Sequence, residues 1–449
     1  MKLKKLVALL LCAAVMLPLA ACVKKPGGSE NSSDTSSSES TAVTPAKDKD
    51  TSIVATDKSR KGPAVQNLMK GITKGKGVSK KPDSRFENAA ASFALDLFRD
   101  EYKSGRKTLV SPLSVFTALA MTQNGAEDRT LSEMQKTLGG LDRDVLNAYM
   151  NAYLAELTGK DSALKCANSI WVDSKLDVKR AFLQKNADFY SAQAYKADFT
   201  STRTVKEINS WVSKNTNGMI KKLVDEFDPL TVMVLMNALC LEAEWDDPYT
   251  DNCVREGTFK NAKGNLVKAE YMYSQETEYI ETENATGFVK YYKGGKFAFV
   301  ALLPNEGTSI DSYIASLTGK GFLGALNSRK NTRANTQMPK FKCEYSNSLV
   351  NTLKKMGMGT AFDENKANFS SIADNSNGNI FIGEVIHKTF IEVAEKGTRA
   401  GAVTAVISEK SAAMPVEQPK EVRLTRPFVY AIIDTQTNLP LFIGAQTDI

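Results

Sequence analysis

Residues 385–408 read VIHKTFIEVAEKGTRAGAVTAVIS. The first half is rich in β-branched and aromatic residues, which predicts a strand. From Gly397 to Ser408 almost every side chain is small, and there is no aromatic residue, no Leu and no carboxylate. These twelve residues are patterned like a strand, yet they are too small to anchor a close-packed core. Core packing therefore does not account for this stretch.

The composition of the chain is that of a globular protein. It has 449 residues, of which 42% are hydrophobic and 24% charged, so there is ample material for a core. The formal net charge of +7 is mild for this length and does not by itself indicate a nucleic-acid partner. No segment after residue 22 is long and apolar enough to span a membrane.

The N-terminus predicts export and a lipid anchor. Residues 1–21 form a signal peptide with a basic start, the apolar run LVALLLCAAVMLPL and a small-residue ending before Cys22. The ending LAAC resembles a bacterial lipobox, in which Cys22 is lipidated and becomes the mature N-terminus; cleavage without lipidation is the alternative. We expect an extracytoplasmic protein anchored to the cell membrane as a lipoprotein.

A change of composition marks the segment that follows. Residues 22–84 are rich in Ser, Thr and Lys and show no apolar period, so we expect a disordered tether that starts at lipidated Cys22. The second half of the tether is basic, which suits contact with anionic lipid or wall polymer; a merely solvated linker is the simpler interpretation, and we favour it. The folded domain is then 85–449, without an internal repeat.

Helices dominate the first part of this domain and strands the second. We predict helices in FENAAASFALDLFRDEY, in the segment that Ser111 caps and Gly125 ends, and in EINSWVSKNTNG. We predict strands in TVMVLMNALCL, FAFVALLP, NIFIGEVIHKTFIEVAE, PFVYAIID and LPLFIGA. This order without regular alternation indicates an α+β fold with mostly antiparallel sheet.

The residues give little support to an enzyme. His387 is the one histidine of the chain, and it lies within a predicted strand, where a buried, hydrogen-bonded role is more usual than catalysis. Cys166, Cys240, Cys253 and Cys343 show no CxxC spacing, so we expect no metal site. One or two disulfides, or four free thiols, are equally compatible with the pattern. We also expect no cofactor.

Residues 86–449 resemble a serpin, the serine protease inhibitor fold. The resemblance rests on TLVSPLSVFTALAMTQNGA, CANSIWVD, INSWVSKNTNGMI, TVMVLMNALCLEAEW, FAFVALLP, MPKFK, VIHKTFIEVAEKGTRAGAVT and RPFVYAII with LFIG, all in the family's order. It implies three β-sheets surrounded by about eight or nine helices, and an exposed reactive-centre loop that begins at GTRAGAVTAVIS. It also implies a monomer.

The family mechanism gives the small residues a purpose. A protease cleaves the loop and forms an acyl-enzyme, and the cut arm, residues 397–409, then inserts into the central sheet and traps the protease, so the serpin is a suicide substrate. Insertion requires one set of alternate side chains to be small and uncharged. That set is Thr398, Ala400, Ala402, Thr404, Val406 and Ser408. The other set holds Arg399, where the family usually has an acidic residue.

The resemblance also assigns supporting residues. Ser111, Ser114, Asn237 and His387 match the polar cluster that controls opening of the sheet. Trp245, Lys340 and Glu395 match the region where the loop first inserts.

The cleaved bond follows from the family spacing. Counting from Glu395 places it at Ser411-Ala412, with Lys410 and Ala413 as alternatives, whereas counting back from Pro427 places it several residues later. Small residues there indicate an elastase- or subtilisin-like target, whereas Lys410 would suit a trypsin-like one. Two other functions stay open: a non-inhibitory serpin that displays its loop as a binding surface, and the solute-binding lipoprotein of an importer.

Overall fold

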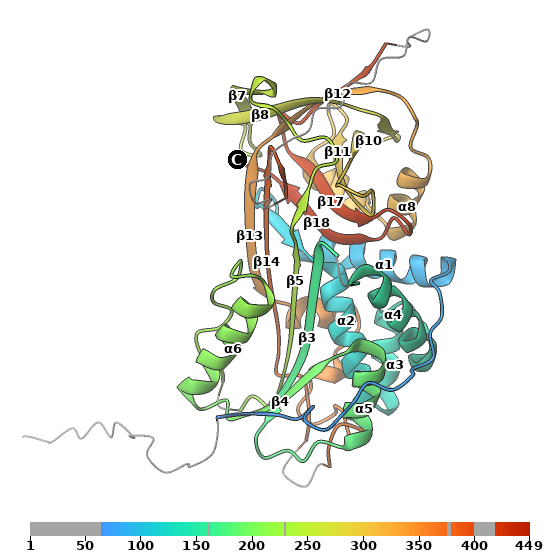
Figure 1. Ribbon diagram of the computed structural model, residues 1–449, viewed down its shortest axis with the longest axis vertical. Helices are drawn as coiled ribbons and strands as arrows, with labels where there is room; N and C mark the ends of the chain where they lie inside the picture. The colour runs from blue at the N-terminus through green and yellow to red at the C-terminus, as the bar shows by residue number, and fades with distance from the viewer. Residues whose placement is uncertain (1–63, 160–161, 229, 375–378, 399–417) are drawn as a thin grey trace, which may run out of the picture. The chain divides into compact units, whose positions relative to one another are not determined.

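The computed structural model describes residues 64–449 except 160–161, 229, 375–378 and 399–417, and at 237 and 238 it describes only the backbone. The described residues lie in one compact unit, Lys61–Ile449. They form three β-sheets, nine α-helices and three short 3-10 helices (Figure 1). Of the helices in these ranges, none has the length and apolar character needed to cross a membrane.

The largest sheet has eight strands. Seven of them follow the order β1-β4-β3-β5-β14-β15-β6, and the eighth, β13, pairs with the other edge of β14. Its strands are β1 (Val65–Asn67), β3 (Leu164–Asp173), β4 (Gln193–Ala197), β5 (Met233–Leu241), β6 (Ala243–Glu244), β13 (Phe341–Ser348), β14 (Glu384–Ala394) and β15 (Gly397–Thr398). We call it the central sheet.

Two smaller sheets complete the β structure. A six-stranded sheet has the order β2-β18-β17-β11-β10-β9, and a four-stranded sheet the order β16-β12-β8-β7. The first contains β2 (Thr108–Val110), β9 (Glu278–Glu281), β10 (Ala285–Tyr291), β11 (Phe297–Pro304), β17 (Phe428–Asp434) and β18 (Pro440–Gln446). The second contains β7 (Val254–Lys260), β8 (Leu266–Glu276), β12 (Ala334–Pro339) and β16 (Lys420–Arg423).

The helices pack around these sheets. They are α1 (Ser84–Glu101), α2 (Pro112–Thr122), α3 (Asp128–Thr137), α4 (Arg143–Leu157), α5 (Arg180–Tyr190), α6 (Thr202–Asn215), α7 (Ile310–Ser316), α8 (Gly319–Asn327) and α9 (Val350–Lys355). The 3-10 helices are η1 (Gln123–Gly125), η2 (Asp251–Cys253) and η3 (Thr360–Phe362).

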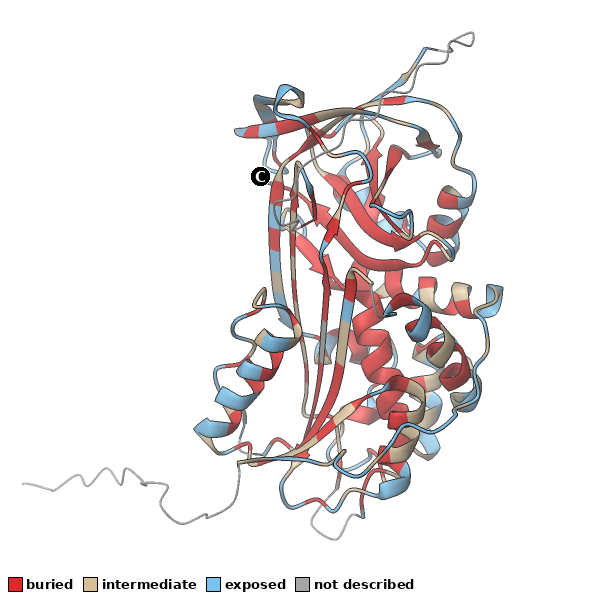
Figure 2. Cartoon of the chain, viewed as in Figure 1, coloured by how far each residue is buried: buried red, intermediate tan, exposed pale blue. Residues whose placement is uncertain are grey.

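Successive side chains of β3 enter two different hydrophobic cores, one on each face of the sheet, so consecutive residues of the strand are apolar. In β3, Ile170 and Val172 belong to the main core that includes α2, while Trp171 between them packs with Trp211 of α6. Both faces of this half of β3 are therefore buried. Along β13 and β14, buried residues alternate with less buried ones (Figure 2).

Most predicted elements are present, with two corrections. The strand predicted from residue 379 begins only at Glu384. Ser111 does precede α2, but its hydroxyl makes no capping bond. Instead the Ser111 Oγ–H donates to the carbonyl of Leu441 on β18 (2.9 Å), which ties the start of α2 to the six-stranded sheet.

Residues 64–82 are not part of a disordered tether, contrary to the prediction. They begin with β1, which pairs with β4, and then run along α5. The Gly75 N–H donates to Asp188 of α5 (2.6 Å), and Gln184 donates to the carbonyl of Thr73 (2.9 Å). Because these contacts use the backbone of the segment, its side-chain pattern gave no sign of them. We call residues 64–82 the N-terminal belt.

Candidate loop-insertion site

The first two residues of the small-residue stretch already form a strand in the central sheet. β15 pairs antiparallel with Val393 and Ala394 of β14 on one side. On its other side it pairs with β6, which follows β5 after a single residue. The root of the reactive loop therefore lies between β14 and the continuation of β5.

Sequence and backbone agree at both positions of β15. Gly397 has φ +149°, and a Cβ there would lie 2.1 Å from the carbonyl oxygen of Ala243, so only glycine fits. Thr398 is 2% exposed, and its hydroxyl shares a hydrogen bond of 2.5 Å with the hydroxyl of Tyr292. Thr398 thus already points into the protein in this state; its predicted place on the inward face of the inserting arm stays a prediction.

The central sheet is parted below β15. β5 and β14 pair in parallel from Val234↔Glu384 to Met236↔Ile386. Above this ladder, residues 387–392 of β14 have no strand partner on the β5 side among the described residues, although β13 pairs with their other edge. We call this gap the slot; it is bounded below by the β5–β14 ladder and above by β15.

Trp245 holds the root of the loop at the upper end of the slot. Its ring N–H donates to the carbonyl of Ala394 (2.8 Å), and its backbone N–H donates to the carbonyl of Lys396 (3.0 Å). The indole stacks on the ring of Tyr292 with centroids 4.4 Å apart, and Tyr292 in turn bonds Thr398. Trp245 thus contacts the chain that leads into β15; that the loop first inserts here stays a prediction.

Lys340 and Glu395 form the ion pair that the resemblance implied. Lys340 Nζ lies 2.7 Å from Glu395 and 3.0 Å from Glu270. Burial raises the pKa of Glu395, but the hydrogen bond from Lys340, a backbone hydrogen bond and the charges of Lys340 and Lys396 together hold that pKa below its usual value. The same bond to Glu395 raises the pKa of Lys340. Both side chains stay partly exposed, at 27% and 31%.

A second, buried ion pair lies beside this end of the slot, and sequence analysis missed it. Lys290 of β10 is 2% exposed, and its Nζ lies 2.8 Å from Glu276 of β8. The ammonium also lies over the rings of Tyr249 (4.5 Å) and Trp245 (5.6 Å). The one available signal was a lysine inside the apolar run GFVKYY, and its partner is fourteen residues away.

His387 stands at the lower end of the slot, next to the last rung of the β5–β14 ladder. It is 2% exposed, and its Nε2 accepts the backbone N–H of Ser111 (3.1 Å). Burial lowers the pKa of His387 to about 4, so the ring is neutral at pH 7. His387 is thus buried and hydrogen-bonded; its predicted role in control of sheet opening stays a prediction.

The other members of the polar cluster are only partly placed. Ser114 is buried on α2, one turn after Ser111. The backbone of Asn237 lies in β5 beside the slot, but its side chain lies outside the described residues. Cys22, the inserting residues from Ala400 to Ser408, and the bond region at Lys410, Ser411, Ala412 and Ala413 also lie outside them.

The cysteine alternatives are resolved for the described residues. None of Cys166, Cys240, Cys253 and Cys343 forms a disulfide. Within the same ranges, no three His, Cys, Asp or Glu side chains gather in a way that could hold a metal ion.

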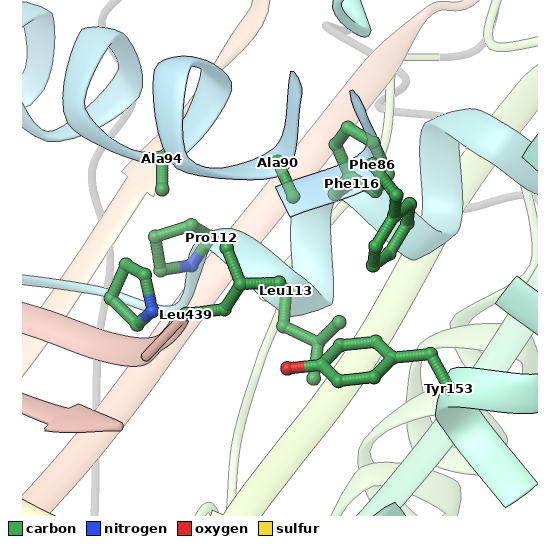
Figure 3. Close-up of a pocket in the computed structure, with 9 residues that line it drawn as sticks. Phe86, Ala90, Ala94, Pro112, Leu113, Phe116, Tyr153 and Leu439 are labelled. Carbon is green, nitrogen blue, oxygen red and sulfur yellow. The ribbon is translucent and has the colours of Figure 1, made fainter. Parts of the chain in front are cut away.

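A small cavity lies where α1 and α2 meet the turn before β18 (Figure 3). Its volume is about 20 Å³, room for about one water molecule. Phe86, Leu113, Phe116 and Leu439 line it, so its wall is almost entirely apolar. This cavity is a packing defect between layers rather than a ligand site.

The comparisons with known proteins agree on one family. A family model described as Serpin (serine protease inhibitor) matches residues 88–449. An uncharacterized serpin-like protein of Thermococcus kodakarensis is 32% identical over 364 residues, covering 80% of this chain and 84% of that protein. Serpin B6 of Pongo abelii is 31% identical, covering 79% of this chain and 97% of that protein.

Solved structures add information on the conformation. The thermophilic serpin tengpin in its native state is 42% identical, with a TM-score of 0.82, and covers 86% of this chain and 100% of that chain. The same protein in its latent state gives a TM-score of 0.73 at 39% identity, covering 83% of this chain and 100% of that chain. The structure is therefore more similar to the native form.

Proposed function

Because this chain belongs to the serpin family, we propose that it is an inhibitory serpin that traps serine proteases as a suicide substrate. The family is one of protease inhibitors rather than catalysts. The observation that carries the proposal is β15, which holds the first residues of the loop inside the central sheet directly above a parted slot. The loop could therefore begin to insert at β15 and continue into the slot between β5 and β14.

The chemistry requires only the protease's own machinery. Its serine oxygen attacks the carbonyl carbon before the scissile bond, the C–N bond breaks, and the new amino terminus leaves with the proton that the serine loses. An ester then joins the loop to the protease. As the arm enters the slot, it carries the ester and the protease along the sheet, which distorts the protease's active site before water hydrolyses the ester.

The alternation beyond Thr398 fits this path. Thr398 faces inward, and strand geometry places every second residue after it on the same face. These are the small residues Ala400, Ala402, Thr404, Val406 and Ser408. In an inserted strand Arg399 would take the opposite parity, toward solvent, so its departure from the family pattern is compatible with insertion.

The side chains of residues 410–413 indicate which class of protease the loop would fit. A bond at Ser411-Ala412, or one residue on at Ala413, would fit the shallow pockets of elastase- or subtilisin-like proteases, and Lys410 a trypsin-like one. We propose the first class.

Two alternatives are weaker. A non-inhibitory serpin that displays its loop would tolerate proline or charge on the inward face, whereas 398–408 contain neither on that face. A solute-binding lipoprotein would need regular βαβ units, but the central sheet is largely antiparallel and the family is serpin.

We also propose that the protein acts extracytoplasmically, as a monomer held to the membrane by lipid on Cys22 after loss of residues 1–21. The LAAC ending of the leader supports this.

The direct test is incubation with elastase, subtilisin and trypsin, followed by denaturing gel electrophoresis and mass measurement of the released C-terminal peptide. We expect an adduct that survives denaturation and a peptide that begins at residue 412. Complete loop cleavage without an adduct from any of the three proteases would instead support the display alternative. Lipidation is tested separately, by comparing the mass of the N-terminal peptide with that from a Cys22→Ser chain.

A further inference from the structure

The N-terminal belt carries positive charge only. Residues 64–82 contain five lysines and neither Asp nor Glu. Lys80 forms an ion pair with Asp83 at the start of α1. The other four lysines are exposed: Lys70, Lys74, Lys76 and Lys81. Figure 2 shows the belt as a largely exposed strip that runs past α5.

Helix α5 adds a fifth exposed cation, and its one acid, Asp188, is bonded to the belt backbone. Arg180 is exposed and donates to the belt carbonyl of Gly71 (3.3 Å). The acids around this face are already engaged: Asp144 with Lys185, Asp374 with Lys179, Asp177 with Lys196, and Asp188 with Gly75 and Gln184. We call the five exposed cations the basic face: Lys70, Lys74, Lys76, Lys81 and Arg180. Among the described residues, no carboxylate oxygen lies within 4.0 Å of their charged nitrogens.

The basic face is preorganised. Hydrogen bonds from β4, α5 and α4 hold the belt backbone, including Asn151 Nδ2 to the carbonyl of Gly77 (3.4 Å). The chain between the lysines is thus fixed in the free protein, so docking orders only the ends of their side chains.

The basic face includes the part of the described chain that is nearest in sequence to Cys22. The chain that follows Cys22 joins the body at Ala64, the first residue of the belt. The described ends of the reactive loop are β15, which pairs with β14 and β6, and β16, which pairs with β12. Figure 1 shows β12 at the opposite end of the view from α5. A body docked through the belt and α5 would present its loop away from the surface.

We propose that the basic face docks on the anionic phospholipid surface of the membrane and orients the reactive loop outward. The inference deepens the proposed function and rests on the proposed anchor at Cys22. A juxtamembrane cation contributes about 1 kcal/mol, or roughly fivefold in binding, and clusters of about four to eight suffice for anionic lipid. The attraction acts within about a Debye length, so it also predicts loss of binding at high salt.

The test uses the chain from residue 22 onward with Cys22→Ser, so that no acyl chain contributes. Its partition onto phosphatidylcholine vesicles is measured by sedimentation with and without phosphatidylglycerol. One variant changes the five cations of the basic face to Gln. A matched control changes five exposed lysines elsewhere to Gln: Lys103, Lys260, Lys263, Lys268 and Lys320. Unfolding curves check that both variants are folded.

We expect binding only to vesicles that contain phosphatidylglycerol, at least about 100-fold weaker for the basic-face variant and within about threefold of the parent for the control. Equal losses in both variants would show a net-charge effect and overturn the proposal. So would binding to soluble polyphosphate but not to vesicles. Adduct formation with protease in solution should be unchanged in the basic-face variant. A parent that binds vesicles yet forms no adduct with any protease would remove the inhibitory function and leave the docking surface standing.

Discussion

The two ends of the slot are stabilised by different chemistry. At the upper end, beside Trp245, two ion pairs surround the root of the loop, one partly exposed (Lys340–Glu395) and one buried (Lys290–Glu276). At the lower end His387 is neutral and accepts a single backbone N–H from α2.

The difference indicates a division of roles along β14. The upper end must release and admit chain, and partly exposed charges can separate into water at small cost. The lower end must keep two strands together, and a buried neutral acceptor leaves a donor unsatisfied if it is lost. The upper end should therefore respond to charge and salt, and the lower end to pH.

The largest effect should come from a charge on the inward face of the arm that inserts at the upper end. Ala402→Arg would place an unpaired cation on the inward face of the inserting arm, which insertion would bury, at a cost of several kcal/mol. Insertion should stall, and the ratio of stable adduct to cleaved chain should fall at least about tenfold. Val403→Arg, which adds the same charge at outward parity, should retain the adduct. Equal losses in both variants would contradict the alternation.

Breaking the buried ion pair should be the next largest effect. Lys290→Met leaves Glu276 without its cation and should lower stability by roughly 3–5 kcal/mol in the first urea transition. The double variant with Glu276→Leu removes both charges and should recover most of that loss. A single variant as stable as the parent would show that this pair does not hold the upper end.

At the lower end the effect should appear as pH dependence. The pKa of His387 lies near 4 in the folded protein and near 6.5 in an unfolded chain. The unfolded state therefore binds the proton first, and the stability present above pH 6.5 is lost as pH falls toward 4, by roughly 3 kcal/mol. His387→Ala should be less stable and more prone to polymerise at pH 7, with a weaker pH dependence over this window. An equal change of melting temperature with pH in the parent and in His387→Ala would refute the role assigned to His387.

Features that depend on neighbouring residues in the sequence could be predicted, and contacts between residues far apart in the sequence could not. The inward position of Thr398 needs only the period of a strand, so it was predictable. Its partner Tyr292 is 106 residues away, and no local pattern links the two. The same holds for Lys290 and Glu276, whose contact depends on how two different sheets meet.

The belt shows a second limit. Its composition is that of a linker, because it lacks an apolar period, yet it is docked through backbone groups such as the Gly75 N–H and the Thr73 carbonyl. Every residue except proline offers those groups, so composition cannot predict such docking. The side chains of α5 that bond this backbone, Gln184 and Asp188, could be identified only from the folded structure.

The smallest expected effect concerns the exposed pair at the upper end. Lys340→Gln removes the bonds to Glu395 and Glu270, whose side chains are 31% and 58% exposed, so stability should fall by only about 0.2–1 kcal/mol. The loss should shrink in high salt, because screening already weakens the pair in the parent. Lys342→Gln breaks a comparable pair with Glu392 on the same strands but away from the loop root, and it serves as the control. If Lys340→Gln accelerates conversion of the native protein to an inactive form while Lys342→Gln does not, the ion pair controls the loop root rather than overall stability. Equal rates in both variants would instead reduce Lys340–Glu395 to an ordinary surface pair and leave control of the upper end to Trp245 and the buried Lys290.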